Sequence, residues 1–392
     1  MELSICKENL FHSPPENEDV DDTDLRRPWS DLPLELVELI ASSLPLADRL
    51  RFPSVCKRWS STSTSLSSSK RWPWLMYLPN DCNGIYKMFD PLDGKLYSMD
   101  NELPADIGRL GLRYSKDGWV LLDDDNYSIF IMNPFSPEEV VYLPDPNFPY
   151  MFYGISFSSP PTNSDCIVFG IMDTTIFNGS SVEICTWRYG NDAWSTKVYE
   201  NNTHFLTARN NPVFHEGRFY CLGRCGNLGV FDPRNNSWTV LDNPTHPLSF
   251  VRESHYDIDA MRNVRRKGRE QCYLVETSKG ELVSVFVHNN GKPIKVCRLD
   301  KLKMSWRKVE DLGDEIVFVD ARCSMSIAAP FNGTGNRIYF PRCLCEDGCP
   351  KEGVYYDLKS KNHHTNSKYD VEERATCTWI IPSMDDRKKS SM

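Results

Sequence analysis

The stretch "GRFYCLGRCGNLGVFDPRNNSWTVL", residues 217–241, decides the expected fold. A short apolar run is followed by a glycine-containing turn and by a second apolar run that ends in Asp-Pro. After the polar turn "RNN" comes a tryptophan that opens a third run. Short apolar runs separated by Gly, Pro and Asn are typical of strands joined by tight turns. This segment therefore predicts consecutive strands of one small sheet.

Weaker copies of this unit occur elsewhere in the chain. "VEICTWRYGNDAWSTKV" and "IKVCRLDKLKMSWRKV" echo its second half, so that Trp194, Trp238 and Trp306 take equivalent places. From about residue 85 onward short strands alternate with turn signals, and helical periodicity is nearly absent. Units of roughly 40 to 50 residues with an aromatic near the third or fourth strand are typical of propeller blades. We expect an all-β propeller of about six blades.

A different pattern precedes it, in "WSDLPLELVELIASSLPLADRLRFPSVCKRWSS", residues 29–61. Pro33 and Glu35 suit the first turn of a helix, and Pro45 ends it. Apolar residues follow with helical spacing at Leu32, Leu36, Val37, Leu39, Ile40 and Leu44. "LADRLRF" predicts a second short helix, and "SVCKRW" opens a third. Such a unit is too small to be stable alone and too apolar for one small core, which indicates a partner.

The remaining segments set the expected domain order. Residues 1–27 are largely acidic and polar and are expected to be disordered, and residues 383–392 form a second disordered tail. The helical unit takes residues 28–61, a Ser-rich linker residues 62–71, and the propeller residues 72–382. The predicted class is therefore a multidomain chain with a small three-helix unit followed by an all-β propeller.

Composition limits the function classes. The formal net charge of -9 argues against a general nucleic-acid binder, because phosphate contacts need clustered Lys and Arg. The first residues do not form a secretory signal, and no apolar run approaches the roughly 20 residues of a membrane span. We expect a soluble protein of the nucleus, the cytoplasm or both, without membrane contacts. The 14 cysteines are expected to be mostly free and buried.

A zinc site is one candidate that the sequence raises. Its possible ligands are Cys323, Cys343, Cys345, Cys349, Cys377, His363 and His364. Structural zinc sites usually pair cysteines on each of two knuckles, and the C-x-C-x-x-x-C cluster has no matching second pair. The two histidines are adjacent, so their side chains diverge on a strand. No metal is therefore expected.

Three further runs are expected to be solvated turns or loops. The basic run at residues 261–270 could contact an acidic partner, but a loop between strands explains it as well. The acidic run at residues 122–126 lacks the length and the closing Glu of a calcium loop. "GTGN" at residues 333–336 indicates a turn. No catalytic motif occurs, so neither an enzyme nor a cofactor is expected.

The helical unit resembles an F-box. "LPLELVELIASSLPLADRLRFPSVCKRW" has the Leu-Pro start, the central "LP" and the closing Val-Cys-x-x-Trp. The C-terminal part resembles a plant kelch-like β-propeller family often called KIB-type. The matching residues are "CYLVETSKGELVSVF" (272–286), "RLDKLKMSWRKVEDLGDEIVFVD" (298–320) and "RIYF" with "GVYYDL" (337–358). The cysteine-rich loop "CLCEDGC" is a departure from that family, and its role stays open.

The resemblance implies a substrate-receptor subunit of SCF-type ubiquitin ligases. The F-box would dock on a Skp-type adaptor that bridges to a cullin, while the propeller recruits a protein target, and the subunit itself would do no chemistry. The residues expected to dock on the adaptor are Leu32, Pro33, Leu36, Ile40, Leu44, Val55, Cys56 and Trp59. The alternative for Leu36, Ile40, Val55 and Trp59 is that they only pack on one another. Alternative functions are a binding protein outside any ligase and a propeller enzyme.

Overall fold

The chain forms two compact units, residues 1–66 and residues 67–392. The computed structural model describes residues 29–44, 52, 55–60, 72–78, 86–91, 94–99, 110–124, 128–145, 152–173, 179–208, 210–224, 226–241, 271–287, 293–320, 322–330, 333–341, 354–365 and 376–382. The domain boundaries proposed from the sequence stay a prediction, because both expected tails and the whole linker, residues 62–71, lie outside these residues.

The first unit is helical. It contains a 3-10 turn, η1 (Trp29–Asp31), and the helices α1 (Leu34–Ser43) and α3 (Lys57–Ser60). Pro33 precedes α1 as its cap, and its carbonyl accepts hydrogen bonds from Leu36 N at 3.0 Å and Val37 N at 3.1 Å. Proline suits this position because the first amides of a helix have no partner within the helix. The second helix, predicted over residues 46–52, lies outside the described residues except for Phe52.

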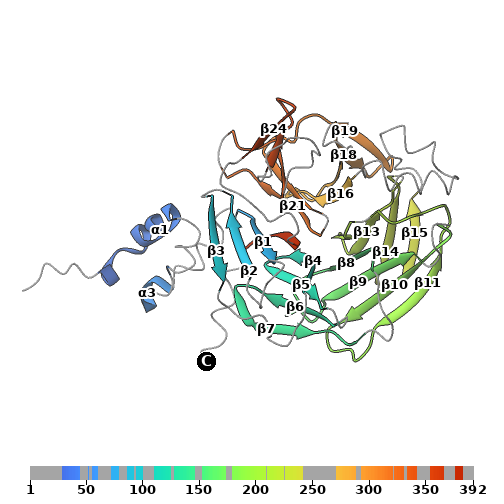
Figure 1. The fold of residues 1–392 in the computed structure, drawn as a ribbon, viewed down its shortest axis with the longest axis horizontal. Helices are drawn as coiled ribbons and strands as arrows, with labels where there is room; N and C mark the ends of the chain where they lie inside the picture. Colours follow the sequence, from blue (N-terminus) through green and yellow to red (C-terminus); the bar gives the residue numbers. More distant parts are fainter. Residues whose placement is uncertain are drawn as a thin grey trace, which may run out of the picture. The chain divides into compact units, whose positions relative to one another are not determined.

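The second unit consists of six sheets that surround a central axis (Figure 1). Blade 1 holds β1 (Trp74–Leu78), β2 (Tyr86–Asp90), β3 (Lys95–Met99) and β25 (Thr376–Ile380). Blade 2 holds β4 (Gly111–Lys116), β5 (Trp119–Asp123), β6 (Ile129–Asn133) and β7 (Ser136–Tyr142). Blade 3 holds β8 (Gly154–Phe157), β9 (Ile167–Asp173), β10 (Ser181–Arg188) and β11 (Ser195–Glu200).

The other three blades complete the ring. Blade 4 holds β12 (Val213–His215), β13 (Arg218–Leu222), β14 (Leu228–Asp232) and β15 (Ser237–Leu241). Blade 5 holds β16 (Gln271–Glu276), β17 (Leu282–Val287), β18 (Ile294–Asp300) and β19 (Ser305–Val309). Blade 6 holds β20 (Glu315–Val319), β21 (Ser324–Ala328), β22 (Arg337–Phe340), β23 (Val354–Asp357) and β24 (Asn362–Thr365). The predicted six-bladed propeller is confirmed.

The repeated tryptophans have one shared role, which is to bind the preceding blade. Trp194, just before β11, donates from Nε1 to Pro144 O at 2.9 Å. Trp238 in β15 donates to Asn201 Oδ1 at 2.8 Å, and Trp306 in β19 donates to Gly226 O at 2.7 Å. Each acceptor belongs to the blade before the one that holds the tryptophan. The sequence repeat therefore marks a recurring hydrogen bond between neighbouring blades.

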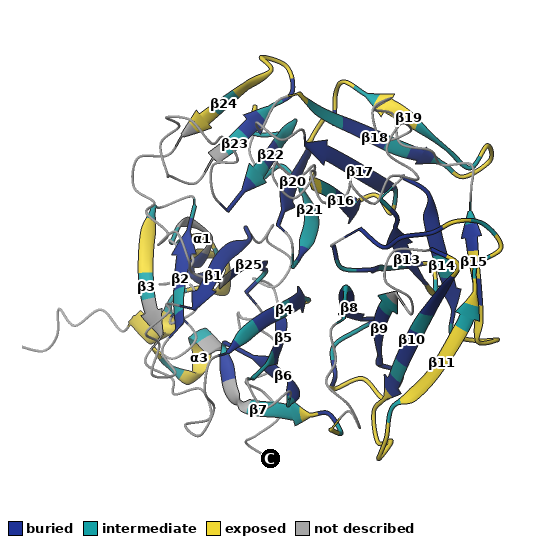
Figure 2. Cartoon of the chain, turned by 45° about the vertical axis from the view of Figure 1, so that its right-hand side comes forward, coloured by how far each residue is buried: buried dark blue, intermediate teal, exposed yellow. Residues whose placement is uncertain are grey.

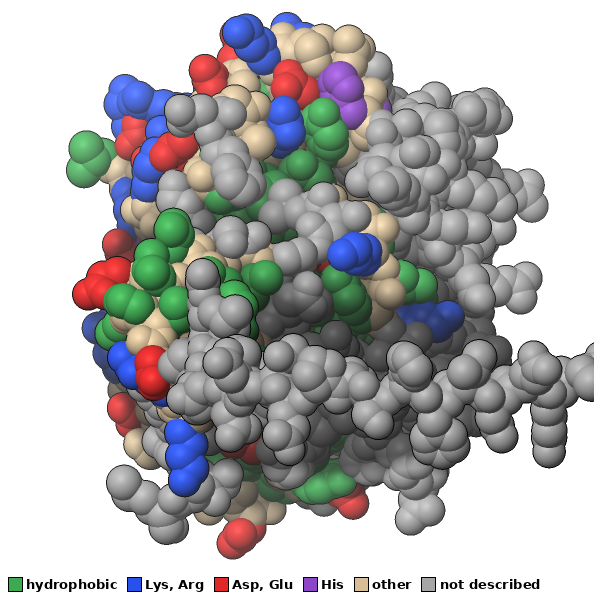
Figure 3. Space-filling model, turned by 90° about the vertical axis from the view of Figure 1, so that its left-hand side faces the viewer, with side chains coloured by type: hydrophobic (Ala, Val, Ile, Leu, Met, Phe, Trp, Pro, Cys, Tyr) green, Lys and Arg blue, Asp and Glu red, His purple; other side chains and the backbone are tan. Residues whose placement is uncertain are grey.

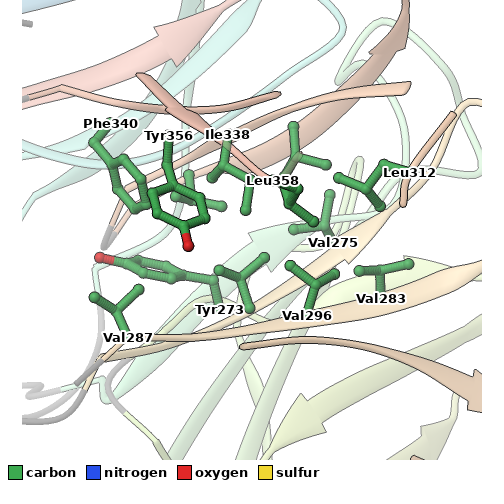
Figure 4. Packing of buried hydrophobic residues seen from close by; sticks show 13 residues of the cluster. Tyr273, Val275, Val283, Val287, Val296, Leu312, Ile338, Phe340, Tyr356 and Leu358 are labelled. Atoms are coloured by element: carbon green, nitrogen blue, oxygen red, sulfur yellow. The ribbon is translucent and has the colours of Figure 1, made fainter. Parts of the chain in front are cut away.

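Burial is highest in the second strands from the axis, such as β1, β5, β17 and β20, and it falls toward the outer strands (Figure 2). The innermost strands β25, β4, β8, β12, β16 and β21 follow one another around the axis. Apolar side chains fill the space between blades. Figure 4 shows the cluster between blades 5 and 6, where valines of β16, β17 and β18 face Ile338, Phe340 and Tyr356. Outer strands such as β11 are largely exposed, which is typical of the edge of a blade.

The C-terminal strand closes the ring. β25 pairs antiparallel with β1, with Leu75 opposite Trp379 and Trp74 opposite Ile380, so the last strand of the chain is the innermost strand of the first blade. Cys377, Trp379 and Ile380 are buried there. Blade 1 is therefore assembled from both ends of the propeller sequence.

Blade 6 departs from the other blades in strand order. Its order is β21-β20-β22-β23-β24, and β20 pairs in parallel with β22. The innermost strand of this blade, β21, is thus the second of its five strands in sequence order, and it follows β20 after a tight turn. Asp320 in that turn is only 5% exposed, and its Oδ1 accepts the amide hydrogens of Arg322 and Cys323.

Removing the Trp379 side chain should destabilise the closed ring. We expect Trp379→Ala to lower the free energy of unfolding by about 3 to 5 kcal/mol, because a large buried side chain leaves a cavity. Urea denaturation followed by circular dichroism measures this, with Leu302→Ala as the control, since Leu302 is 98% exposed. A loss as small as that of the control would contradict the role of β25 in closure.

The turn at Asp320 predicts a pH dependence. Burial raises the pKa of the Asp320 carboxyl to about 6, against about 3.9 for an exposed Asp. Between about pH 4 and 6 the folded chain keeps a proton that the unfolded chain has released, so this group lowers the unfolding free energy as the pH rises. Asp320→Asn has no such proton, so its stability relative to the wild type should increase across this window by up to about 3 kcal/mol. Parallel pH profiles of the two proteins would refute this.

Candidate functional site

The helical unit has a small core. Among its described residues the buried apolar side chains are Val37, Ala41 and Phe52, and Leu32, Ile40, Leu44 and Trp59 pack partly against them. Val37 and Ala41 lie four residues apart, so they share the inner face of α1. The inner face of α1 therefore packs against Phe52 in the described part of this unit.

Trp59 ties the third helix to the start of the unit. Its ring stacks on Phe52, with the ring centroids 4.4 Å apart. Its Nε1 donates to Trp29 O at 3.2 Å, and its backbone N approaches Cys56 Sγ at 3.5 Å. Beside it Arg58 and Asp31 form an exposed ion pair at 3.7 Å. These contacts give Trp59 a structural role inside the unit.

Large apolar side chains face solvent on the same small unit. Their exposed fractions are 66% for Trp29, 45% for Leu34, 45% for Leu36, 65% for Leu39 and 62% for Val55. Leu36 and Leu39 are three residues apart and therefore neighbours on the surface of α1. A single exposed leucine is ordinary, but the described part of this unit exposes more large apolar side chains than it buries, which favours a binding function.

The predicted docking residues divide into two groups. Pro33, Leu36 and Val55 are exposed, and Cys56 is half-buried. Leu32, Ile40, Leu44 and Trp59 are half-buried against the internal core. The alternative of internal packing thus describes Ile40 and Trp59 but not Leu36 and Val55. The docking role of all eight stays a prediction.

The structure adds three exposed side chains that the predicted set does not contain. Trp29 and Leu34 flank the predicted Leu-Pro start, and Leu39 lies on α1 beside Leu36. Leu39 does carry a signal in the sequence, since it belongs to the helical apolar pattern. That pattern spreads over more than one face of α1, and it does not tell the buried face from the exposed one.

The candidate zinc ligands are only partly described. Cys343, Cys345 and Cys349 lie outside the described residues. His364 stacks on Tyr355 with centroids 4.8 Å apart, whereas His363 lies beside Tyr356, so the two rings diverge along β24 as expected. Within the parts that the structure describes, no group of three His, Cys, Asp or Glu residues could hold a metal ion.

The described cysteines are free, and most are buried. Burial raises the pKa of the Cys185 and Cys297 thiols to about 11 and the pKa of Cys323 to about 12. These thiols are therefore protonated at neutral pH, and a protonated thiol is a poor nucleophile.

The acidic run at residues 122–126 is partly described and the run at residues 333–336 is described, and they form the end of a strand and turns. Asp123 accepts a hydrogen bond from Arg113 Nε at 2.6 Å, and Asp124 Oδ1 accepts one from Ser128 N at 2.8 Å. Gly333 and Asn336 have positive φ angles of 80° and 62°, as a turn requires. The basic run at residues 261–270 lies outside the described residues.

The surface shown in Figure 3 mixes charge signs. Where side chains are described, Lys and Arg alternate with Asp and Glu, and apolar groups lie between them. No helix in the described ranges is long and apolar enough to span a membrane.

A helical unit with an exposed apolar surface, joined to a closed six-bladed propeller, defines the class of F-box proteins that carry a propeller. The F-box domain model matches residues 29–71, and the KIB1-4 beta-propeller model matches residues 88–357. The chain belongs to the KIB1-4 beta-propeller family.

Relatives in Arabidopsis thaliana share both parts. The chain is 33% identical to F-box/kelch-repeat protein At1g57790 over 86% of this chain and 88% of that protein. It is 29% identical to F-box protein At3g56470, over 90% of this chain and 88% of that protein. It is 26% identical to F-box protein KIB4, over 84% of this chain and 88% of that protein. The resemblance to a plant F-box protein with a KIB-type propeller is thereby confirmed.

Two substitutions separate core from surface in the helical unit. Phe52→Ala removes a buried ring and the stacking partner of Trp59, so it should cost about 3 kcal/mol or more and expose the α1 amides to exchange. Leu39→Ala changes an exposed side chain and should cost less than about 0.5 kcal/mol. Hydrogen exchange at Val37 and Ala41 measures both. Equal protection in the two variants would show that Phe52 is not part of this core.

Proposed function

We propose that this chain is a substrate-receptor subunit of an SCF-type ubiquitin ligase that docks on a Skp-type adaptor through its helical unit. An F-box joined to a propeller, together with F-box relatives over most of the chain, supports a receptor role in general. The observation that carries the proposal is the exposure of Leu36, Leu39 and Val55 in the segment matched by the F-box.

Exposed aliphatic side chains on a short helix suit a groove in the adaptor. An amphipathic helix binds by burying its apolar side in a hydrophobic groove, and a few central anchors supply most of the binding energy. Leu36 and Leu39 supply adjacent anchors on α1, and Val55 supplies one just before α3. The half-buried Ile40, Leu44 and Trp59 hold these elements in place and contribute to docking indirectly. Through the adaptor the chain reaches the cullin.

The propeller then presents a protein target to the ligase. Its blades pack their apolar faces against one another. The target would therefore bind to side chains on the outer surface of the propeller and not to these packed faces. The role is positioning, since F-box/kelch-type proteins are typically non-catalytic adaptors. A receptor of this kind would act in the nucleus, the cytoplasm or both.

The docking surface can be tested with two exposed anchors and, separately, with the predicted Leu-Pro start, in which Leu32 is half-buried. Leu36→Ala with Val55→Ala should weaken capture of a purified Skp-type adaptor by about tenfold or more, because each lost anchor costs about 1 to 2 kcal/mol. The same loss is expected for Leu32→Ala with Pro33→Ala. Both pairs belong to the helical unit, so the circular dichroism of the propeller strands should be unchanged.

Leu302→Ala is the matched control, because it truncates an apolar side chain that is 98% exposed on the propeller. Adaptor capture that stays at the control level in both double variants would refute docking through this surface. Loss of adaptor with retention of target proteins would separate the two units. Capture of adaptor without any cullin would instead favour a binding protein that acts outside a ligase.

A further inference from the structure

The turn between β20 and β21 makes hydrogen bonds that skip the neighbouring blade. Arg322 donates from Nη1 to Leu112 O, and Cys323 Sγ donates to Ser115 O at 3.2 Å. Both acceptors lie in β4, the innermost strand of blade 2, whereas the turn belongs to blade 6. Blade 1 lies between these two blades, so the contacts cross the inner part of the ring instead of joining adjacent blade faces.

A third blade joins this contact through Asn211, which lies just before β12 of blade 4. Asn211 Nδ2 donates to Arg113 O of blade 2 at 2.5 Å and also to Arg322 O of blade 6. Its Oδ1 accepts a hydrogen bond from Ile155 N of blade 3 at 3.0 Å. Blades 2, 4 and 6 alternate around the ring, so a side chain of blade 4 that binds both blade 2 and blade 6 lies close to the axis.

The strand order of blade 6 allows this reach. In the other blades the innermost strand follows a connection from elsewhere in the ring, whereas β21 follows β20 through a tight turn. Asp320 N donates to Cys323 O at 3.0 Å, and Asp320 Oδ1 accepts the amide hydrogens of Arg322 and Cys323. Hydrogen bonds within the turn thus fix its conformation independently of the other blades. This lowers the entropy cost of its contacts across the axis.

We propose that the turn between β20 and β21 is a latch that locks the ring across its axis. The pairing of β25 with β1 closes the ring along its circumference, and the latch joins the last blade to blades 2 and 4 through the centre. The two devices act together, so that loosening the latch opens blade 6 and the closing strand even though Asn211 belongs to blade 4.

Other asparagines of the same region join only adjacent blades. Asn210 is buried, and its Nδ2 donates to Cys272 O of blade 5 at 2.9 Å. Asn202, after β11, exchanges two hydrogen bonds with Val240 of blade 4. Asn210 therefore offers a matched comparison, because it is the direct neighbour of Asn211 and also donates to a backbone carbonyl.

Substitution by aspartate isolates the latch bond. Asn211→Asp keeps the size of the side chain and the acceptor for Ile155 N, but it turns a donor into an acceptor that faces two carbonyl oxygens. Asn210→Asp makes the same change toward blade 5. Hydrogen exchange of the full chain should then show amides of β20, β21 and β25 exchanging about tenfold or more faster in Asn211→Asp. In Asn210→Asp the increase should stay in blades 4 and 5.

Arg322→Met provides a second variant if Asn211→Asp does not fold. It keeps the apolar stem of the side chain and removes the bond to Leu112 O together with the positive charge beside Asp320, while the bond from Asn211 to Arg322 O remains, so it should raise exchange at the same strands to a smaller extent. The proposal is overturned if the Asn211→Asp and Arg322→Met effects stay within the strands beside the substituted residue. It is equally overturned if Asn210→Asp opens β20, β21 and β25 to the same degree.

Discussion

The pairing of the last strand with the first blade is the constraint on which the rest of this molecule depends. Every blade buries two apolar faces against its neighbours, so a blade with only one neighbour leaves a face in water. Closure by β25 removes the free-energy cost of such an exposed face between blades 6 and 1. At this seam Leu75 and Phe318 pack together with Trp379. The described residues of this seam all belong to the propeller.

The two units differ in how their described large apolar side chains are distributed. The propeller places its large aromatic side chains, such as Phe169 and Phe286, in fully buried positions between blades. The helical unit leaves Leu36, Leu39 and Val55 in solvent. The exposed large apolar side chains described in the propeller lie on four different blades, whereas those described in the helical unit lie within one short segment. This concentration is the physical basis for assigning the exposed side chains of the helical unit to a partner.

Much of this fold could be predicted from the sequence because its repeat has a physical cause. Trp194, Trp238 and Trp306 recur since each binds the preceding blade. Beside Trp238 the chain has Gly229, because a side chain there would collide with the Trp238 ring. The order of blade 6 could not be predicted in this way. A parallel contact between β20 and β22 leaves no local signal, since strand patterns report burial and turns but not which strands become neighbours.

The candidate site was predictable only in outline. Helical spacing places Leu36, Leu39 and Ile40 on α1, but the same spacing fits a residue that packs inward and one that faces a partner. The half-buried state of Ile40 follows from Val37, Ala41 and Phe52, and Phe52 reaches the core from a segment beyond Pro45. Such contacts depend on how the helices pack, which no local pattern encodes.

The most direct test of the account compares the intact chain with a chain of residues 72–392 in capture from plant extract. The account predicts that the Skp-type adaptor and a cullin are retained by the intact chain and lost from the shorter one. It also predicts that target proteins are retained by both, since the ring closes within the propeller. Adaptor retained by residues 72–392, or captured by neither chain, would contradict it.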